Sequence, residues 1–336
     1  MNKYPCRCHF IPDVVFKEIE KDGYDVKQPT RTGLDKSVRT RRESFMGIAT
    51  AMPVVGNNER LVFDSQFTSS HQLKLARKEG DAPAKDDDVN AVYDNSGIVR
   101  DYFKTVLEWD SIDNASMDLL LNVHYLVKYN NAFWDGEQMI FGDGDGANFK
   151  HFARALDVTA HELTHGVVQY TANLEYKGQS GALNEHFADV FGSAIKQYFF
   201  KQNEMTANWL IGEMCLSGRF QGKAIRSMKS PNDANVVMMS QPDHMDKIFK
   251  GSSDNFGVHI NSGIPNYAFY LAAMGIGTQN AAFLWFEALK ILKPTAKFKD
   301  LYKALTKVAK RLILIKKVPA STQVTLDAAF KKVGII

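Results

Sequence analysis

The sequence predicts an α+β protein in which a strand-containing part is followed by a mainly helical part. Short apolar segments at 60–64 and 73–77, each bounded by polar turns, indicate strands. Residues 130–141 carry two further apolar segments around Asp135 and Gly136, which is a β-hairpin signal. The tail of the chain instead has apolar residues at helical spacing, in 267–274, 281–292 and 301–314.

The composition excludes several classes of protein. The chain has 336 residues, enough for two domains, and a formal net charge of only +3, which gives no strong attraction to nucleic acid. No apolar run approaches the roughly 18 residues of a membrane span. The N-terminus lacks the apolar core of a conventional signal peptide. We therefore expect export by a route that needs no such signal, or retention in the cytoplasm.

Residues 1–50 differ from the rest of the chain. A short apolar segment, Val14–Phe16, is followed by a polar, turn-rich tract from Lys17 to Gly33 and by the basic run 39–42. A charged, poorly packed tract between two segments is typical of a boundary and an exposed cleavage site. We interpret residues 1–50 as a removable prosegment; a floppy N-terminal arm is the alternative.

Between Ala51 and Asn148 the pattern is mixed. Apolar residues at helical spacing predict one helix over 89–107 and a second over 115–130. The loop 142–146, Gly-Asp-Gly-Asp-Gly, resembles a calcium loop but lacks the later ligands of an EF-hand, so we interpret it as a tight glycine turn.

The stretch His161-Glu162-Leu163-Thr164-His165 is the strongest chemical signal in the chain. Nothing between Asp157 and Gly166 breaks a helix, so His161 and His165, four residues apart, point the same way and can close on one metal ion. Glu162 lies about 100° further around the helix, where its carboxylate can take a proton from metal-bound water. The pattern predicts a zinc site; a helix that carries two histidines by accident is the alternative.

A second predicted helix, 182–192, offers a third ligand. Catalytic zinc takes three protein ligands and keeps one position open. Glu185 is a carboxylate on an otherwise apolar helix face, where an unpaired charge is costly to bury unless it binds a metal. Asp189, on the same face, can accept the free N–H of a zinc-bound histidine. A solvated glutamate on a surface helix is the alternative.

Together these motifs resemble the thermolysin family of zinc metallopeptidases. Glu185 follows His161 by 24 positions, within Gly-Ala-Leu-Asn-Glu, and further matching stretches lie at 130–134, 225–228 and 254–263. The resemblance runs from about Arg60 to the C-terminus. Residues 6–12, Cys-Arg-Cys-His-Phe-Ile-Pro, are similar to the short prosegment of the protealysin-like branch, although Asp13 stands where a second proline is expected.

The resemblance implies a peptide-bond hydrolase with a two-domain thermolysin-like fold. Residues 1–50 would be a short propeptide that inhibits its own chain. Residues 51–155 would form an α/β N-terminal catalytic domain. Residues 156–336 would provide the zinc helix and a mainly helical C-terminal domain, with the active-site cleft between the two. We expect protein or peptide substrates and a monomer.

The resemblance also implies roles for individual residues. One zinc ion would be held by His161, His165 and Glu185. Catalysis would rest on Glu162 as general base and then proton donor, with His259 and Tyr176 as donors to the tetrahedral oxyanion. The histidines would be oriented by Asp189, Asn184 and Asp254.

The implied substrate contacts fall into two groups. Asn131, Ala132 and Arg226 would bind the substrate main chain. A hydrophobic pocket would be formed by Phe149, Phe152, Val158, Ile211 and Ile225. Such a pocket implies cleavage before a bulky apolar residue.

Calcium binding is where the sequence departs from the family pattern. Asp157 and Glu213 fit the double calcium site of some members, with Asn208 as a third candidate ligand. However, Lys196, Asn208 and Leu210 stand where carboxylates are expected. Calcium needs oxygen ligands, and the lysine ammonium could replace one ion. We expect at most one Ca²⁺.

Three features keep alternatives open. Cys6 or Cys8 could supply a thiolate to the zinc and hold the enzyme latent, or both could be ordinary packing residues. With Cys215 they make no disulfide framework.

The lysine-rich tail 290–317 is typical of the solvated faces of amphipathic helices; the alternative is that it binds an acidic surface or a membrane. An active endopeptidase, a binding module on an inactive peptidase fold, and a zinc hydrolase acting on other bonds are the function classes to separate.

Overall fold

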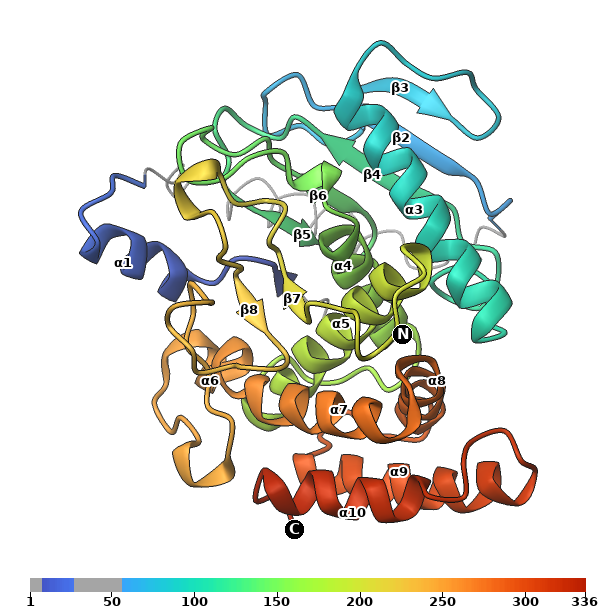
Figure 1. Cartoon of the computed structure of the whole chain (residues 1–336). Helices are drawn as coiled ribbons and strands as arrows, with labels where there is room; N and C mark the ends of the chain where they lie inside the picture. The colour runs from blue at the N-terminus through green and yellow to red at the C-terminus, as the bar shows by residue number, and fades with distance from the viewer. Residues whose placement is uncertain (1–7, 27–55) are drawn as a thin grey trace, which may run out of the picture.

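The structure is a computed structural model that describes residues 8–26 and 56–336. Figure 1 shows the strands of the main sheet in the upper half of the molecule and helices α7 to α10 in the lower half, with α4 and α5 between them. The predicted arrangement of a strand-containing part followed by a helical part is confirmed.

Within the described residues, the larger sheet has the strand order β1-β5-β6-β4-β2-β3. Its strands are β1 (Cys8–His9), β2 (Arg60–Asp64), β3 (Lys74–Lys78), β4 (Leu119–Val123), β5 (Ala132–Trp134) and β6 (Met139–Phe141). β4 runs parallel to both β2 and β6, whereas the remaining neighbours are antiparallel. The edge strand β1 comes from the predicted prosegment, so this segment adds a strand to the sheet of the main domain.

The strands expected at 60–64 and 73–77 and the hairpin around Asp135 and Gly136 are confirmed, as is the first helix, α3 (Asp87–Val106). The helix expected over 115–130 is wrong, because its centre forms β4. This strand lies between two parallel neighbours and is mostly buried. A continuous apolar run is typical of such a strand and carries no period that separates it from a buried helix.

The N-terminal part also differs from expectation. The tract from Lys17 onward was expected to be rich in turns. Its first residues, up to Lys21, instead belong to helix α1 (Asp13–Lys21). Its buried face, formed by Val15, Phe16 and Ile19, joins the main hydrophobic core.

Two long helices form the centre of the molecule: α4 (Leu156–Tyr170) and α5 (Gly178–Phe199), both almost entirely buried. The loop expected over 176–181 is therefore shorter, because α5 begins at Gly178. The remaining helices are α6 (Ser253–Asn261), α7 (Gly263–Ile276), α8 (Thr278–Leu289), α9 (Phe298–Leu314) and α10 (Thr322–Lys332). A two-stranded sheet of β7 (Leu210–Ile211) and β8 (Arg226–Ser227) and three 3₁₀ turns at 152–154, 218–220 and 245–247 complete the described elements.

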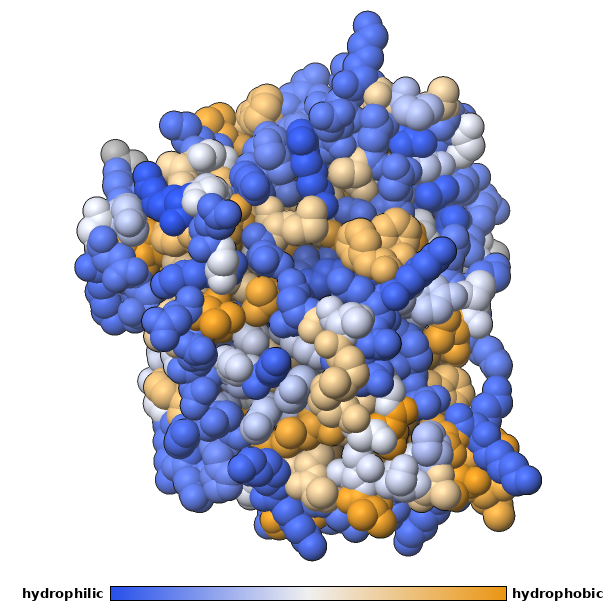
Figure 2. All heavy atoms as spheres, in the orientation of Figure 1, coloured by the Kyte–Doolittle hydropathy of each residue, from blue (hydrophilic) through white to orange (hydrophobic). Residues whose placement is uncertain are grey.

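Helix α9, the last but one of the described helices, is amphipathic. Its lysines are exposed, whereas its apolar residues at helical spacing are buried. Leu314, the last residue of α9, is 82% exposed. Figure 2 shows hydrophobic residues gathered toward the bottom and lower right of an otherwise largely hydrophilic face. Across the described ranges, none of the helices has the length and apolar character needed to cross a membrane.

Candidate active site

Three candidate zinc ligands from α4 and α5 converge on one point. The Nε2 atoms of His161 and His165 lie 3.1 Å apart, and Glu185 carboxylate oxygens lie 3.4 Å and 3.5 Å from them. Ligand atoms about 2.0–2.1 Å from a tetrahedral zinc ion stand about 3.3–3.4 Å from one another. The three side chains are fully buried, so the spacing and the chemistry of this donor set fit a zinc ion.

Hydrogen bonds at the far side of each imidazole fix its orientation. His161 Nδ1 lies 2.9 Å from Asp189 Oδ1, and His165 Nδ1 lies 2.8 Å from Asn184 Oδ1. An amide oxygen only accepts, so the Nδ1 atom of His165 carries the proton and its Nε2 lone pair faces the shared point. Glu185 Oε2 is buried and, among the described residues, has no hydrogen-bond partner. A cation at this point would satisfy all three groups.

Glu162 stands beside this point and is held by a backbone group that sequence reasoning missed. Trp134 of β5 donates its N–H to Glu162 Oε2 at 2.9 Å. This contact needs α4 to lie close to the sheet, and Gly166 permits it: a Cβ there would lie 2.6 Å from Ile112 and 3.2 Å from the Trp134 ring. The other oxygen, Oε1, is buried with no partner in the described part of the chain.

Burial holds the pKa of Glu162 well above its usual value, and the nearby Glu185 charge raises it further, against the Trp134 N–H and Arg226. A carboxyl group with a raised pKa can take a proton from water and return it to a leaving group at neutral pH. The environment of Glu162 therefore suits an acid–base role.

Two hydrogen-bond donors lie on the other side of the cluster. The Tyr176 hydroxyl contacts Glu185 Oε1 and lies 3.2 Å from His259 Nε2. His259 Nδ1 lies 2.6 Å from Asp254 Oδ1. Burial lowers the pKa of His259, but the charges of Glu185 and Asp254 outweigh it and raise the pKa overall. A protonated His259 and the phenol of Tyr176 are suitable donors to a developing oxyanion.

Arg226 is fully buried and paired with Asp189. Its Nη2 atom lies 2.9 Å from Asp189 Oδ1, and its Nε atom lies 3.0 Å from Oδ2. Burial opposes ionisation of Asp189, but the charges of Arg226 and the hydrogen bond of His161 hold its pKa below the usual range. Asp189 therefore remains an anion that orients both a candidate zinc ligand and Arg226.

A buried residue of α7 extends this network. Asn266 donates to Asp189 Oδ2 at 2.9 Å, and its own carbonyl lies 2.7 Å from His186 Nδ1. The indole N–H of Trp285 donates to His186 Nε2 at 2.8 Å. No local pattern in the sequence singles out Asn266, because its partners lie 77 and 80 positions away.

The residues expected to bind a substrate main chain are occupied by the N-terminal segment. Phe10 donates its N–H to the Ala132 carbonyl at 3.0 Å, and the Phe10 carbonyl accepts from Arg226 Nη1 at 3.0 Å. Asn131 accepts from the Ile11 N–H at 2.8 Å and donates to the Ile11 carbonyl at 2.9 Å. His259 Nε2 lies 2.9 Å from the His9 carbonyl oxygen.

The Phe10 side chain lies beside Ile225, one of the residues expected to form the hydrophobic pocket. Its ring meets His161 edge-on at 5.1 Å, and a Cβ at Gly212 would lie 2.8 Å from the Phe10 ring and 2.7 Å from Ile225. The five expected pocket residues are fully buried in the same hydrophobic cluster as Phe10: Phe149, Phe152, Val158, Ile211 and Ile225.

Cys8 also reaches the zinc cluster. Its sulfur and the ligand atoms of His165 and Glu185 all lie within 4.8 Å of one another, and the three side chains are buried. Cys8 is disulfide-bonded in this structure, and Cys215 is free. Cys6, the third cysteine of the sequence, lies outside the described residues.

The candidate calcium ligands are engaged by other groups of the protein. Asp157 is buried and binds the Lys196 ammonium at 2.9 Å and the Gly212 N–H at 3.1 Å. Asn208 and Glu213 instead bond each other at 2.8 Å at the surface. Lys196 thus supplies the positive charge beside Asp157.

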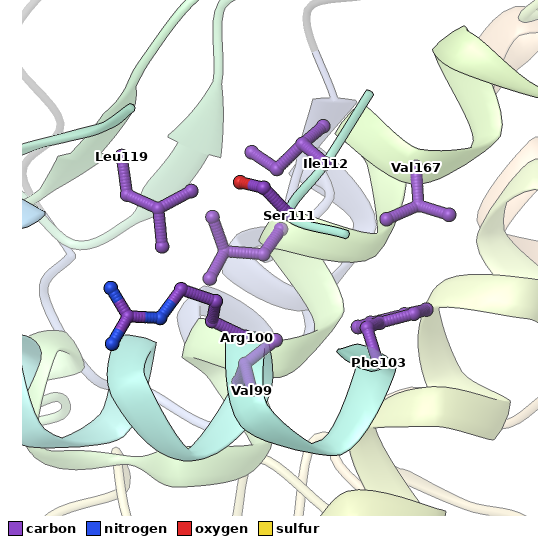
Figure 3. Close-up of a pocket in the computed structure, with 8 residues that line it drawn as sticks. Val99, Arg100, Phe103, Ser111, Ile112, Leu119 and Val167 are labelled. Atoms are coloured by element: carbon purple, nitrogen blue, oxygen red, sulfur yellow. The ribbon is translucent and has the colours of Figure 1, made fainter. Parts of the chain in front are cut away.

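A separate small pocket lies between α3 and α4. Figure 3 shows Val99, Arg100, Phe103, Ser111, Ile112, Leu119 and Val167 around it, with Leu163 as the eighth lining residue. None of these residues belongs to the zinc cluster or to the expected substrate contacts. We assign the pocket no function.

Two imidazoles and a carboxylate around one point, beside a buried carboxyl group with a raised pKa, define the class of metal-dependent hydrolases. Two family models match the chain: the thermolysin metallopeptidase catalytic domain over residues 21–169 and its alpha-helical domain over residues 172–335. The chain therefore belongs to the thermolysin family of metallopeptidases and is a metalloendopeptidase, and membership of this family implies zinc.

Individual relatives agree with this assignment. The chain is 42% identical to an extracellular metalloprotease of Pectobacterium carotovorum over 72% of this chain and 73% of that protein. It is also 42% identical to protease PrtS of a Photorhabdus species, over 74% and 67% of the two chains. Among solved structures, it resembles the precursor of protealysin, a metalloproteinase from Serratia proteamaculans. That match has a TM-score of 0.81 and 34% identity and covers 98% of this chain and 100% of that one.

Proposed function

We propose that this chain is a zinc endopeptidase made as a precursor, in which residues 1–50 block the active site, and that it cleaves before a bulky apolar residue. One observation carries the zinc assignment: the ligand atoms of three buried side chains lie 3.1–3.5 Å apart, beside Glu162 Oε1, which has no hydrogen-bond partner among the described residues. Phe10, which is buried beside Ile225, one of the expected pocket residues, supports the preference for an apolar residue after the scissile bond.

Different residues have different roles in the hydrolysis. Zinc held by His161, His165 and Glu185 would polarise the substrate carbonyl and acidify a water molecule. Glu162 takes the proton of the attacking water and passes it to the leaving nitrogen. His259 and Tyr176 donate to the oxyanion, a contribution of roughly 2.7–4 kcal/mol for each donor in comparable sites.

Three other residues hold the substrate backbone. Arg226 donates to the carbonyl of the residue after the scissile bond, and Ala132 pairs with the same residue in the manner of an added strand. Asn131 binds the following residue. The contacts of Phe10 and Ile11 supply the pattern for this proposal.

Several further properties belong to the same proposal. The mature enzyme begins near Ala51, acts as a monomer on proteins or peptides outside the cell, and binds at most one Ca²⁺. Export would need no conventional signal peptide. The ammonium of Lys196 beside Asp157 supports the low calcium requirement.

The test is hydrolysis of casein and of furylacryloyl dipeptides by the purified chain. We expect activity that 1,10-phenanthroline stops and that serine-protease inhibitors leave unchanged. Glu162→Gln removes it, whereas the matched change Glu108→Gln at an exposed position does not. A wild type that binds zinc, yet never shortens near residue 51 and never cleaves a peptide, would identify a binding module instead.

A further inference from the structure

The backbone of the N-terminal segment crosses the candidate active site in the register of a substrate. We propose that the His9–Phe10 peptide bond is a self-cleavage site, hydrolysed by the active site of its own chain. The inference rests on the proposed zinc endopeptidase function and names one of its substrates.

The main chain runs through the site as a paired strand. β1 is antiparallel to β5, with Cys8 opposite Trp134 and His9 opposite Phe133, and the Phe10 N–H continues the pairing to Ala132. Extended peptides bind to a sheet edge through such main-chain hydrogen bonds. The bond between His9 and Phe10 thus lies within a stretch held on both sides.

The two carbonyls around this bond contact different groups. The His9 carbonyl oxygen lies 2.9 Å from His259 Nε2, which is the candidate oxyanion donor. The Phe10 carbonyl oxygen accepts from Arg226, which has no contact with the His9 carbonyl among the described hydrogen bonds. The carbonyl in the position of attack is therefore that of His9, and the leaving nitrogen is that of Phe10.

The side chain after the bond fits the same register. Phe10 is fully buried between the His161 ring, Ile225 and Gly212. A bulky apolar residue at this position is the expected substrate preference. The Phe10 side chain and the backbone contacts therefore both point to the His9–Phe10 bond as the one that is cleaved.

The reaction consumes one water molecule. The water oxygen bonds to the carbonyl carbon of His9, and its proton moves to Glu162. The bond from that carbon to the Phe10 nitrogen breaks, and Glu162 returns the proton to the nitrogen. The products are a peptide ending in a His9 carboxylate and a chain that begins with a Phe10 amine.

This cut removes β1 without releasing the rest of the segment. The pair formed by Ile11 and Asn131 remains, as does the contact of Phe16 with Phe149, whose ring centroids are 5.8 Å apart. After this cut, the part of the site that β1 occupied is free. The part that Phe10 occupies stays blocked until a later cut near residue 51.

The test follows the intact mass of the zinc-loaded full chain with time, together with its activity on casein. We expect a species beginning at Phe10 in the wild type and none in Glu162→Gln. Its rate of formation should be unchanged over a tenfold range of protein concentration, because the reaction is intramolecular. Phe10→Gly should slow it at least tenfold. Phe10→Leu keeps a bulky apolar side chain and should cleave at close to the wild-type rate, as should Tyr24→Ala, a change in the same segment away from the bond.

The outcomes separate the two proposals. A chain that hydrolyses casein but never yields a species beginning at Phe10 overturns the self-cleavage site and leaves the peptidase intact. The same holds if the rate rises in proportion to concentration, or if Glu162→Gln is cut equally. If neither casein nor the chain itself is cut, the proposed function fails and the self-cleavage site fails with it.

Discussion

The Nε2 atoms of His161 and His165 face each other at 3.1 Å inside the protein, while both Nδ1 atoms are engaged by Asp189 and Asn184. Two buried acceptor nitrogens and the Glu185 carboxylate stabilise one another only if a cation lies between them. The metal should therefore contribute to the stability of the fold as well as to catalysis.

Zinc removal should lower the free energy of unfolding. In Glu162→Gln, which cannot digest itself, a zinc concentration 100-fold above the dissociation constant should add about 2.7 kcal/mol relative to the metal-free chain. Urea unfolding with and without a chelator measures this difference. Glu185→Gln should reduce it strongly, and an equal unfolding midpoint in all four samples would contradict a shared zinc site.

His259→Ala should reduce kcat about 10²–10³-fold with a small change in KM, because an oxyanion donor acts mainly in the transition state. Steady-state kinetics on a furylacryloyl dipeptide measures both constants in chain that has lost its prosegment. Asp254→Asn leaves His259 in place but removes the charge that orients it, so its loss should be intermediate. An increase in KM alone would instead make His259 a substrate-binding residue.

Lys196→Met should destabilise the fold, because it leaves the buried Asp157 carboxylate without its ammonium partner at 2.9 Å. Breaking a buried ion pair from one side costs about 3–5 kcal/mol. Urea unfolding in the Glu162→Gln background measures the loss, with Lys299→Met on the exposed face of α9 as the control. Added calcium should not stabilise the parent chain, and a saturable rise in its midpoint would show that calcium binds.

The parts of the site that residue spacing alone predicted are local, whereas Tyr176, Arg226 and His259 were expected only through the family resemblance. His161 and His165 share a helix face because they are four residues apart, and Asp189 stands in the same relation to Glu185. The Trp134 N–H and Asn266 could not be found in this way, because tertiary packing alone brings them to Glu162 and Asp189. Their positions depend on how closely α4 approaches β5 and how α7 packs on α5.

The errors in the fold have a similar origin. The run Leu119–Val123 forms a strand that is buried between two parallel strands. The sequence of the run does not indicate that it has such neighbours. Helix α1 is short and most of its residues are polar, although Val15, Phe16 and Ile19 have helical spacing and are buried, with Val14 packed beside them against the core. For β4, tertiary contacts decided the structure against the local pattern.

His124 should make the stability of the N-terminal part depend on pH. Hydrogen bonds to Asp143, together with the charges of Asp143 and Asp86, outweigh burial and raise the pKa of His124 to about 9. A histidine whose pKa is raised in the folded state stabilises the fold. The stabilisation is fully present at pH values below the unfolded-state pKa of about 6.5, and it is lost as the pH rises through 9.

The expected result is a pH-dependent difference between two variants. In the Glu162→Gln background, His124→Gln should lower the free energy of unfolding by about 1 kcal/mol at pH 6, a figure reduced for partial solvent screening. The difference should vanish at pH 10. His244→Gln, which alters a half-buried imidazole elsewhere, is the control, and a loss for His124→Gln that is equal at both pH values would contradict the ionic explanation.

The position of Cys8 predicts that self-shortening responds to redox state. Catalytic zinc keeps one position for water, and a thiolate is a stronger ligand than water at that position. The Cys8 sulfur lies within 4.8 Å of ligand atoms of His165 and Glu185, but in a disulfide it has no thiolate to offer. A phosphine reductant converts the disulfide and one water molecule into two thiols and a phosphine oxide. We expect this to slow the shortening of the wild type at least tenfold, as followed by intact mass.

Cys8→Ser should shorten at the same rate with and without the phosphine, whereas Cys215→Ser should keep the wild-type response. Cobalt in place of zinc gives a second measurement, because a cobalt–thiolate bond absorbs in the near ultraviolet. That absorption should appear on reduction of the Glu162→Gln chain and be absent when Cys8 is also serine. If reduction changes neither the absorption nor the rate, Cys8 packs beside the zinc ligands without binding the metal, and the N-terminal segment blocks the site through its backbone contacts alone.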